Sequence, residues 1–220
     1  MRLIIIKVYK QIFRMFTAIK SAAAAKVFTE SANKVVCDTV EPLAEPFDAA
    51  RYMGTWYEIQ RSSGAIFQPD IQNCTQAEYT DLDAATASFT VKNSFQVLPL
   101  PRAGLTGSAT CAGTPNGQCI VSFFGQKFTE PNYLVMDTDY DTYAMVYACE
   151  PNDMAYLWIL SRTPTLDQDI LDSLNAQAAE RLPNYDFSKA YQNTQGDRCT
   201  YNTYKSASQS YADLKNWFAN

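Results

Sequence analysis

Residues 52–59 read Tyr-Met-Gly-Thr-Trp-Tyr-Glu-Ile, and the architecture of the chain can be worked out from this segment. Aromatic and β-branched side chains in it favour a strand, which we predict over residues 54–62. Seven further strand candidates follow, each bounded by turn-forming residues: 75–82, 88–98, 105–111, 119–125, 133–137, 142–150 and 155–162. Short strands at regular spacing without intervening helices predict an all-β barrel or sandwich rather than a parallel α/β sheet.

One helix is predicted after the last strand. Thr165 and Gln168 fit a capping box, and Pro183 ends the helical pattern. The apolar positions between them fall on one stripe, which predicts packing against the sheet: Ile170, Leu171, Leu174, Ala178 and Leu182. Residues 211–218 fit either a short amphipathic helix or a frayed terminus.

The composition excludes several classes of function. The 220 residues are enough for one full core, and 47% hydrophobic with 19% charged residues excludes intrinsic disorder. The absence of histidine removes Ser-His-Asp and Cys-His nucleophilic sites and the commonest zinc sites, so neither a metal nor a cofactor is expected. No apolar run reaches the roughly 18 residues of a membrane-spanning helix, so an integral membrane protein is not expected.

Charge is distributed unevenly along the chain. Residues 1–29 hold six bases and no acid, whereas residues 30–220 hold 12 bases and 23 acids, a net charge of −11. An acidic body argues against nucleic acid as a partner. We interpret residues 1–29 as a leader, either a secretory signal cleaved near the alanines at 22–25 or an organelle transit peptide, as for a plastid lumen. Residues 30–200 are predicted as the all-β domain, and 201–220 as a tail.

Six cysteines, an even number without a Cys-x-x-Cys pair, indicate three disulfides in an oxidising compartment. Their connectivity is open from the residues alone, except that Cys111 and Cys119 flank a Pro-Asn-Gly turn and are placed to staple a hairpin. Secretion is therefore the favoured location. No residue spacing indicates an oligomer, and a monomer is expected.

Three motifs in order resemble the signature of the lipocalin family. Gly54 and Trp56 lie in the first strand, the turn before the seventh strand reads Thr138-Asp139-Tyr140, and Arg162 ends the eighth strand. The surrounding sequence is similar to the apolipoprotein D and retinol-binding branch, over residues 37–199. The resemblance implies a single eight-stranded antiparallel up-and-down β-barrel with one flanking helix. In it, Trp56 fills one end and Arg162 covers the indole, and these motif residues hold the fold rather than a ligand.

The resemblance also implies a disulfide pattern. In related lipocalins a cysteine near the N-terminus pairs with one that ends the seventh strand, and one that starts the second strand pairs with one beyond the helix. Transferred to this chain, the pattern pairs Cys37 with Cys149 and Cys74 with Cys199. The Cys111–Cys119 bridge is additional to it.

The resemblance and strand parity together imply the expected ligand contacts: the family places Tyr133 inward and Cys149 outward, and alternate side chains along a strand face inward. The ligand-binding set is Tyr79, Phe123, Tyr133, Val135, Val146, Tyr156, Trp158 and Leu160, with Ile66 and Phe67 as a lid on the first loop. Tyr143, Met145 and Tyr147 face outward, beneath the helix. Glu58 and Asp137 are the carboxylates with a chance of facing inward. The register of the third and fourth strands is left open, with Phe89, Val91 and Phe95 as one inward set.

The resemblance implies a non-enzymatic carrier of a small hydrophobic molecule of the retinoid, steroid, bilin, carotenoid or fatty-acid type. An apolar, aromatic lining with phenol hydroxyls suits such a ligand. The alternative is a lipocalin-fold enzyme that acts on a lipophilic substrate, either a thiol-dependent isomerase or a xanthophyll de-epoxidase.

Overall fold

A computed structural model of the chain describes residues 37–65, 67–97, 101–150, 154–201 and 205–206, so the predicted leader and most of the predicted tail lie outside the described residues. Eight strands follow one another in an antiparallel meander, and each pairs with the next. Their bounds are β1 Gly54–Ser62, β2 Asn73–Asp83, β3 Ser88–Gln96, β4 Ala103–Thr110, β5 Gln118–Phe123, β6 Tyr133–Thr138, β7 Tyr143–Glu150 and β8 Met154–Ser161.

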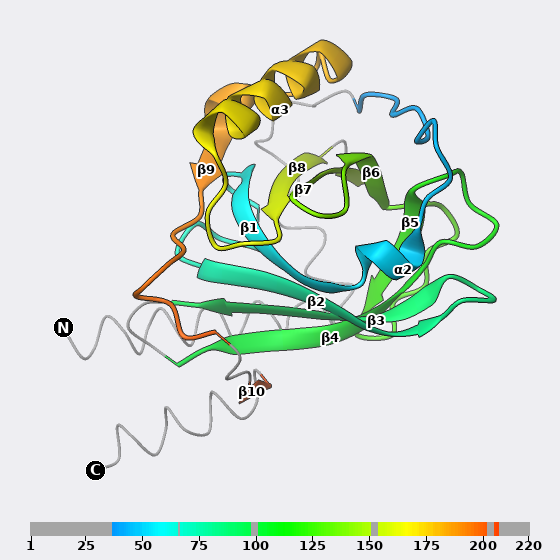
Figure 1. Ribbon diagram of the computed structural model, residues 1–220, viewed down its shortest axis with the longest axis horizontal. Helices are drawn as coiled ribbons and strands as arrows, with labels where there is room; N and C mark the ends of the chain where they lie inside the picture. Colours follow the sequence, from blue (N-terminus) through cyan, green and yellow to red (C-terminus); the bar gives the residue numbers. More distant parts are fainter. Residues whose placement is uncertain (1–36, 66, 98–100, 151–153, 202–204, 207–220) are drawn as a thin grey trace, which may run out of the picture.

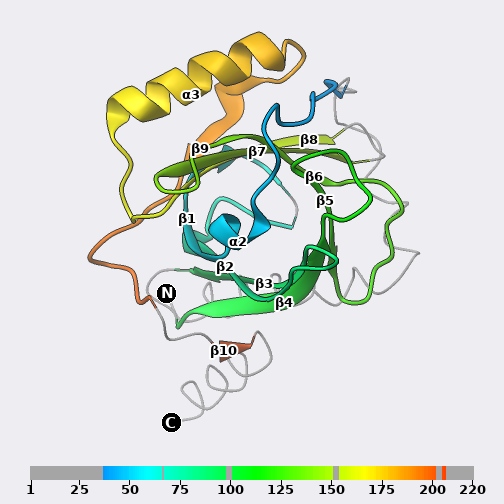
Figure 2. The same ribbon diagram turned by 45° about the vertical axis from the view of Figure 1, so that its right-hand side comes forward.

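The meander closes on itself because β8 also pairs with β1. The result is an eight-stranded barrel, visible as a ring of strands in Figure 2, which confirms the predicted fold class. The predicted strands differ from the observed ones by no more than two residues at either end. The strand pattern predicted either a barrel or a sandwich. The β1–β8 pairing shows that the sheet forms a barrel.

The two ends of the barrel differ in what covers them. A one-turn helix, α2 (Ala49–Tyr52), precedes β1 and lies at the end that also holds the β6–β7 turn; we call this the plug end. Asp48 caps α2 by accepting a hydrogen bond from the Arg51 amide, and Asn116 in the β4–β5 turn binds the backbone just before it. Strands β1, β3, β5 and β7 end at the opposite end of the barrel, which we call the mouth.

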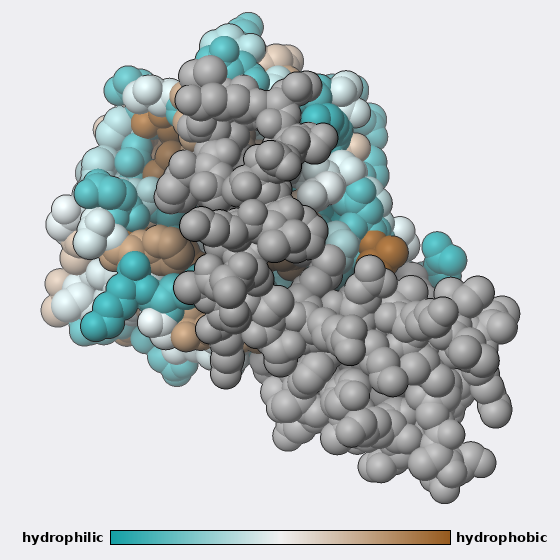
Figure 3. Space-filling view, turned by 180° about the vertical axis from the view of Figure 1, so that it is seen from behind, coloured by the Kyte–Doolittle hydropathy of each residue, from teal (hydrophilic) through white to brown (hydrophobic). Residues whose placement is uncertain are grey.

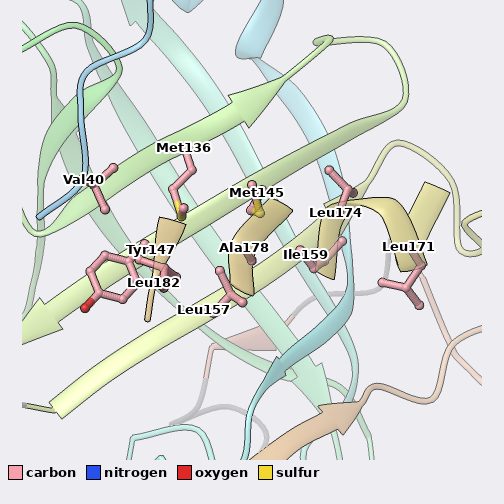
Figure 4. Close-up of a cluster of buried hydrophobic side chains, with 10 residues drawn as sticks. All are labelled: Val40, Met136, Met145, Tyr147, Leu157, Ile159, Leu171, Leu174, Ala178 and Leu182. Carbon is pink, nitrogen blue, oxygen red and sulfur yellow. The ribbon is translucent and has the colours of Figure 1, made fainter. Parts of the chain in front are cut away.

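The helix α3 (Gln168–Arg181) lies along the outside of the barrel (Figure 1). Its apolar stripe packs on β6, β7 and β8 as expected, in a cluster shown in Figure 4: Val40, Met136, Met145, Tyr147, Leu157, Ile159, Leu171, Leu174, Ala178 and Leu182. The predicted capping box is wrong. Asp167 is the N-cap, and its carboxylate accepts from the Asp169 amide, because the chain enters the helix two residues later than Thr165.

Three disulfides tie the flanking segments to the barrel. They are Cys37–Cys149, Cys74–Cys199 and Cys111–Cys119, the same pairs that the family pattern and the hairpin turn predicted. After α3 the chain forms a 3₁₀ turn, η2 (Phe187–Lys189), and β9 (Ala190–Gln192), which pairs with β1. A two-residue strand, β10 (Lys205–Ser206), runs parallel to β4. Seen from behind, the surface of the described residues is mostly hydrophilic with separate apolar patches (Figure 3).

Candidate ligand-binding interior

The plug end is filled by Trp56 and covered by Arg162. Trp56 is 0% exposed, and its indole nitrogen donates to the Tyr52 carbonyl at 2.9 Å. The Arg162 guanidinium carbon lies 3.6 Å from the indole ring centroid, a cation–π contact. The guanidinium also donates to four backbone carbonyls, those of Arg51, Met53, Thr55 and Tyr140. Arg162 thereby ties the N-terminal segment, β1 and the β6–β7 turn together at this end.

Gly54 is required at the plug end because of its backbone. It has a φ of +93°, and a Cβ atom there would lie 3.6 Å from Arg162 Nη1.

The Thr138-Asp139-Tyr140 motif stabilises the turn in which it lies. Asp139 accepts from three backbone amides, and Thr138 donates to the Tyr143 carbonyl, so both close the turn. These contacts account for the motif residues without a ligand.

The half of the barrel nearer the mouth is less tightly filled. Strand register places one set of side chains on the inner face, yet each of them keeps partial solvent exposure: Ala77, Asn93, Leu105, Val121, Phe123, Tyr133 and Trp158. Inward residues nearer the plug end are buried, with Trp56, Val135, Ala144 and Val146 at 0% exposure. An inward side chain reached by solvent lines an opening, so we define these seven residues as the open half.

Aromatic rings stack from the open half toward the mouth. Tyr156 and Trp158 are stacked with ring centroids 5.8 Å apart, and Phe67 on the β1–β2 loop meets Tyr156 edge-on at 4.8 Å. Phe67 itself is 39% exposed. Its ring covers Tyr156 from the solvent side, as a lid residue does. Ile66, the other expected lid residue, lies outside the described residues.

A buried polar network holds the β1–β2 loop to the barrel wall. Glu58 and Arg61 form an ion pair at 2.7 Å, and both are almost fully buried. Burial raises the pKa of Glu58, and the Arg61 guanidinium opposes that rise. Gln68 donates to the other Glu58 oxygen and accepts from the Trp158 indole nitrogen at 3.0 Å. One loop side chain thus bridges two residues of the barrel interior.

Three phenol hydroxyls meet between the plug and the open half. Tyr133 reaches from β6 to the opposite wall, where its oxygen lies 2.9 Å from the hydroxyl oxygens of both Tyr52 and Tyr79. The rings of Tyr52 and Tyr79 are stacked at 5.6 Å. Burial raises the pKa of Tyr79 to about 12 and the pKa values of Tyr52 and Tyr133 well above 10. All three phenols are therefore neutral at physiological pH.

The structure brings most of the expected contact residues together on the inner face. Tyr79, Val135, Val146 and Leu160 lie in the packed cluster with Trp56, beside the partly exposed Phe123, Tyr133 and Trp158. Tyr156 lies nearer the mouth, in a cluster with Ala65 and Ala148. Phe89 and Val91 face inward, and Phe95 is buried on the same face of β3, in agreement with the inward set suggested for that strand.

One expected orientation is wrong. Asp137 does not face into the barrel, since it accepts a hydrogen bond from Tyr143, whose ring packs on the helix side. The register shifts between Val135 and Asp137, and this bulge turns the carboxylate outward. Glu58 does face inward, but its two oxygens bind Arg61, Asn193 and Gln68.

Sequence reasoning missed three interior residues. Tyr52 precedes the first strand, so strand parity said nothing about it. Asn93 and Leu105 belong to the two strands whose register was left open, and the pairings Ala77–Asn93 and Asn93–Leu105 now place both on the inner face. A polar residue among the alternate apolar positions of β3 was the available signal for Asn93.

Neither a metal-binding group nor a membrane-spanning helix is found among the described residues. In that part of the chain, no group of three or more Cys, Asp or Glu side chains is placed to hold a metal ion. None of the helices described here has the length and apolar character needed to cross a membrane. The partly exposed inward residues of the open half define the candidate site.

A closed antiparallel barrel with a plugged end and an accessible aromatic interior belongs to the class of barrels that enclose a small molecule. Sequence comparison specifies the family. A model described as "Lipocalin-like domain" matches residues 47–195, and the chain belongs to the lipocalin family.

Individual relatives agree with this assignment. The chain is 33% identical to the outer membrane lipoprotein Blc of Escherichia coli K12, covering 70% of this chain and 86% of that protein. It is 33% identical to apolipoprotein D of Oryctolagus cuniculus, covering 61% of this chain and 74% of that one. Among solved structures, insecticyanin of the tobacco hornworm Manduca sexta is similar with a TM-score of 0.63 at 26% identity, covering 80% and 95% of the two chains.

Proposed function

We propose that this chain binds and carries a small hydrophobic molecule in the open half of the barrel, without changing it chemically. The observation that supports this proposal is the partial exposure of side chains that face inward, set against the complete burial of those at the plug. Apolar and aromatic walls with a few phenol and amide groups suit a ligand of the retinoid, steroid, bilin, carotenoid or fatty-acid type. Lipocalin relatives support a binding role.

The proposed contacts are the expected set. Phe123, Tyr133 and Trp158 are the first candidates because they are inward and accessible, and Phe67 and Tyr156 cover the approach from the mouth. Tyr79, Val135, Val146 and Leu160 form the floor and wall against which the buried end of the ligand rests. Ile66 remains an expected contact on the same loop as Phe67.

The enzyme alternative has less support. A thiol-dependent isomerase needs a cysteine thiolate that faces the substrate. All six cysteines of this chain are in disulfides, which leaves no thiol for that reaction. No residue of the interior favours de-epoxidation over simple binding.

Three disulfides favour folding in an oxidising compartment, and we propose a secreted protein, with an organelle lumen as the alternative. We further propose that the carrier acts as a monomer, because one barrel holds a complete interior. Size-exclusion chromatography with light scattering tests this point, and a stable dimer contradicts it.

The test of the carrier function has two parts. Native mass spectrometry of protein purified from its source is expected to show one lipophile per chain, released by solvent extraction. Retinoids, steroids, bilins and fatty acids are then titrated into the extracted protein while tryptophan emission is followed. Quenching by at least one class is expected, with a weaker signal in Trp158→Phe, since Trp158 is the indole on the open half. Absence of a bound lipophile together with no quenching by any class overturns the proposal.

A further inference from the structure

The hydroxyl groups of Tyr52, Tyr133 and Tyr79 are linked by two hydrogen bonds, and one of their three O–H donors remains without an acceptor. Three neutral phenols supply three O–H donors, but the two contacts of 2.9 Å consume only two of them. The hydrogen bonds of the described residues include no other partner for these three oxygens. Whichever way the two hydrogen bonds point, one O–H donor is therefore left over, at Tyr52, Tyr79 or Tyr133.

An acceptor without a partner lies on the same wall. The Oδ1 atom of Asn93 is buried and makes no hydrogen bond to the described part of the chain. Tyr79 pairs with Val91, and Asn93 is the next inward residue along β3, on the mouth side. Such diagonal neighbours are about 7–8 Å apart. When the leftover donor is at Tyr79, it and the free acceptor of Asn93 belong to neighbouring inward positions of the same wall, and no hydrogen bond joins them.

A buried polar group without a hydrogen-bond partner lowers the stability of the folded protein, and such groups are rare in native interiors. Both the spare phenol proton and Asn93 Oδ1 belong to this kind of group. Asn93 has two neighbours across the sheet on the inner face, Ala77 and Leu105. Neither carries a polar side-chain atom, and both are partly exposed. A bound ligand that reaches these positions can supply a partner to both groups.

We propose that the carried molecule has an alcohol hydroxyl at its buried end, which accepts the spare phenol proton and donates its own proton to Asn93 Oδ1. A hydroxyl both accepts and donates, whereas a ketone, ether or carboxylate only accepts and a hydrocarbon does neither. This inference rests on the proposed carrier function, and narrows it to one ligand class.

Matched probes separate the two hydrogen bonds. Retinol, retinyl methyl ether and axerophthene share one polyene and end in a hydroxyl, an ether and a methyl group, and all three are followed by energy transfer from tryptophan. A second series, hexadecan-1-ol, hexadecyl methyl ether and heptadecane, is measured by displacement of a bound probe. We expect the alcohol to bind about tenfold more tightly than the ether, and the ether about tenfold more tightly than the hydrocarbon.

The variants assign each step to one partner. In Asn93→Leu the alcohol is expected to lose its advantage over the ether. In the triple variant Tyr52→Phe, Tyr79→Phe, Tyr133→Phe the ether is expected to lose its advantage over the hydrocarbon. The single variant Tyr79→Phe still has two linked phenols and one spare proton, so it keeps that advantage. Tyr143→Phe removes a phenol on the outer face and is the matched control.

The outcomes distinguish this inference from the function on which it rests. Equal affinities of alcohol, ether and hydrocarbon overturn the hydroxyl site while the carrier function stands. A lipid without a hydroxyl, extracted from the natural protein, has the same consequence. If neither series binds and no lipid is extracted, both proposals fail. Should the triple variant not fold, which circular dichroism detects, Asn93→Leu alone decides the question.

Discussion

The two halves of the barrel are built from the same strands but are packed in different ways. At the plug, Trp56 is completely buried, and Arg162 satisfies its donors with four backbone carbonyls and lies over the indole. In the open half, Trp158 is also an inward indole, but it is partly exposed and donates to a side chain of a loop. The comparison shows that the position of an aromatic residue along the barrel axis decides whether it is sealed in the core, like Trp56, or partly exposed, like Trp158.

The largest expected effect comes from exchanging the two indoles for alanine. Trp56→Ala should destabilise the protein by about 3–5 kcal/mol, because the large cavity forms where nothing can collapse into it. Trp158→Ala should lower stability by about 1 kcal/mol, since its ring already faces an opening, yet weaken ligand binding at least tenfold. Urea denaturation and a titration with the extracted ligand measure the two effects. Equal destabilisation by both variants contradicts the division into halves.

The phenols at the boundary predict a response to alkali. The pKa of Tyr79 is raised by burial to about 12 in the folded state from 10.0, so the stability that its neutral form supports is fully present below pH 10 and is lost as pH rises through 12. Relative to Tyr79→Phe, the wild type should lose about 2–3 kcal/mol over that range. Denaturation midpoints of both proteins from pH 8 to 12 measure the difference. Parallel curves show that the phenol ionises as freely as in the unfolded chain.

Arg162 tests whether the plug depends on geometry or only on charge. Arg162→Lys keeps the positive charge but cannot reach four carbonyls at once, so it should cost about 2 kcal/mol of stability. Ligand affinity should change little, because the guanidinium lies on the far side of Trp56 from the open half. Thermal unfolding gives the first quantity and tryptophan quenching the second. A lysine variant as stable as the wild type would show that the carbonyl contacts are unimportant.

The smallest expected effect concerns the loop at the mouth. Gln68→Leu removes the bridge between Glu58 and Trp158, and should lower stability by about 1 kcal/mol. Because the loop is then held less firmly, ligand dissociation measured by stopped flow should be several-fold faster. The control is Gln126→Leu, because Gln126 is an exposed glutamine on the β5–β6 loop, whereas Gln72 is buried next to the affected loop. Unchanged dissociation in Gln68→Leu would mean that the bridge does not slow exit.

Much of this organisation could be predicted from short-range patterns. Eight strand segments, the apolar stripe of α3 and the inward positions on β6, β7 and β8 follow from periodicity, because side chains alternate along a strand and recur every three to four residues along a helix. The same patterns could not predict the Asp137 orientation, since a bulge changes parity without a sequence signal. Nor could they predict the Asp167 cap, because several polar residues near it were equally suitable.

Contacts between residues on different strands could not be predicted from local sequence patterns. That Tyr133 meets Tyr52 and Tyr79, which are 81 and 54 positions away, depends on the tilt and closure of the whole barrel. The inward position of Asn93 depends on its register with Ala77 and Leu105, which the local pattern of either neighbouring strand leaves undetermined. The strands, the helix and the family could be predicted from the sequence because side-chain periodicity and short motifs each involve only a few neighbouring residues. The interior that a ligand meets was settled by strand closure, since it is made of side chains that only the assembled sheet brings together.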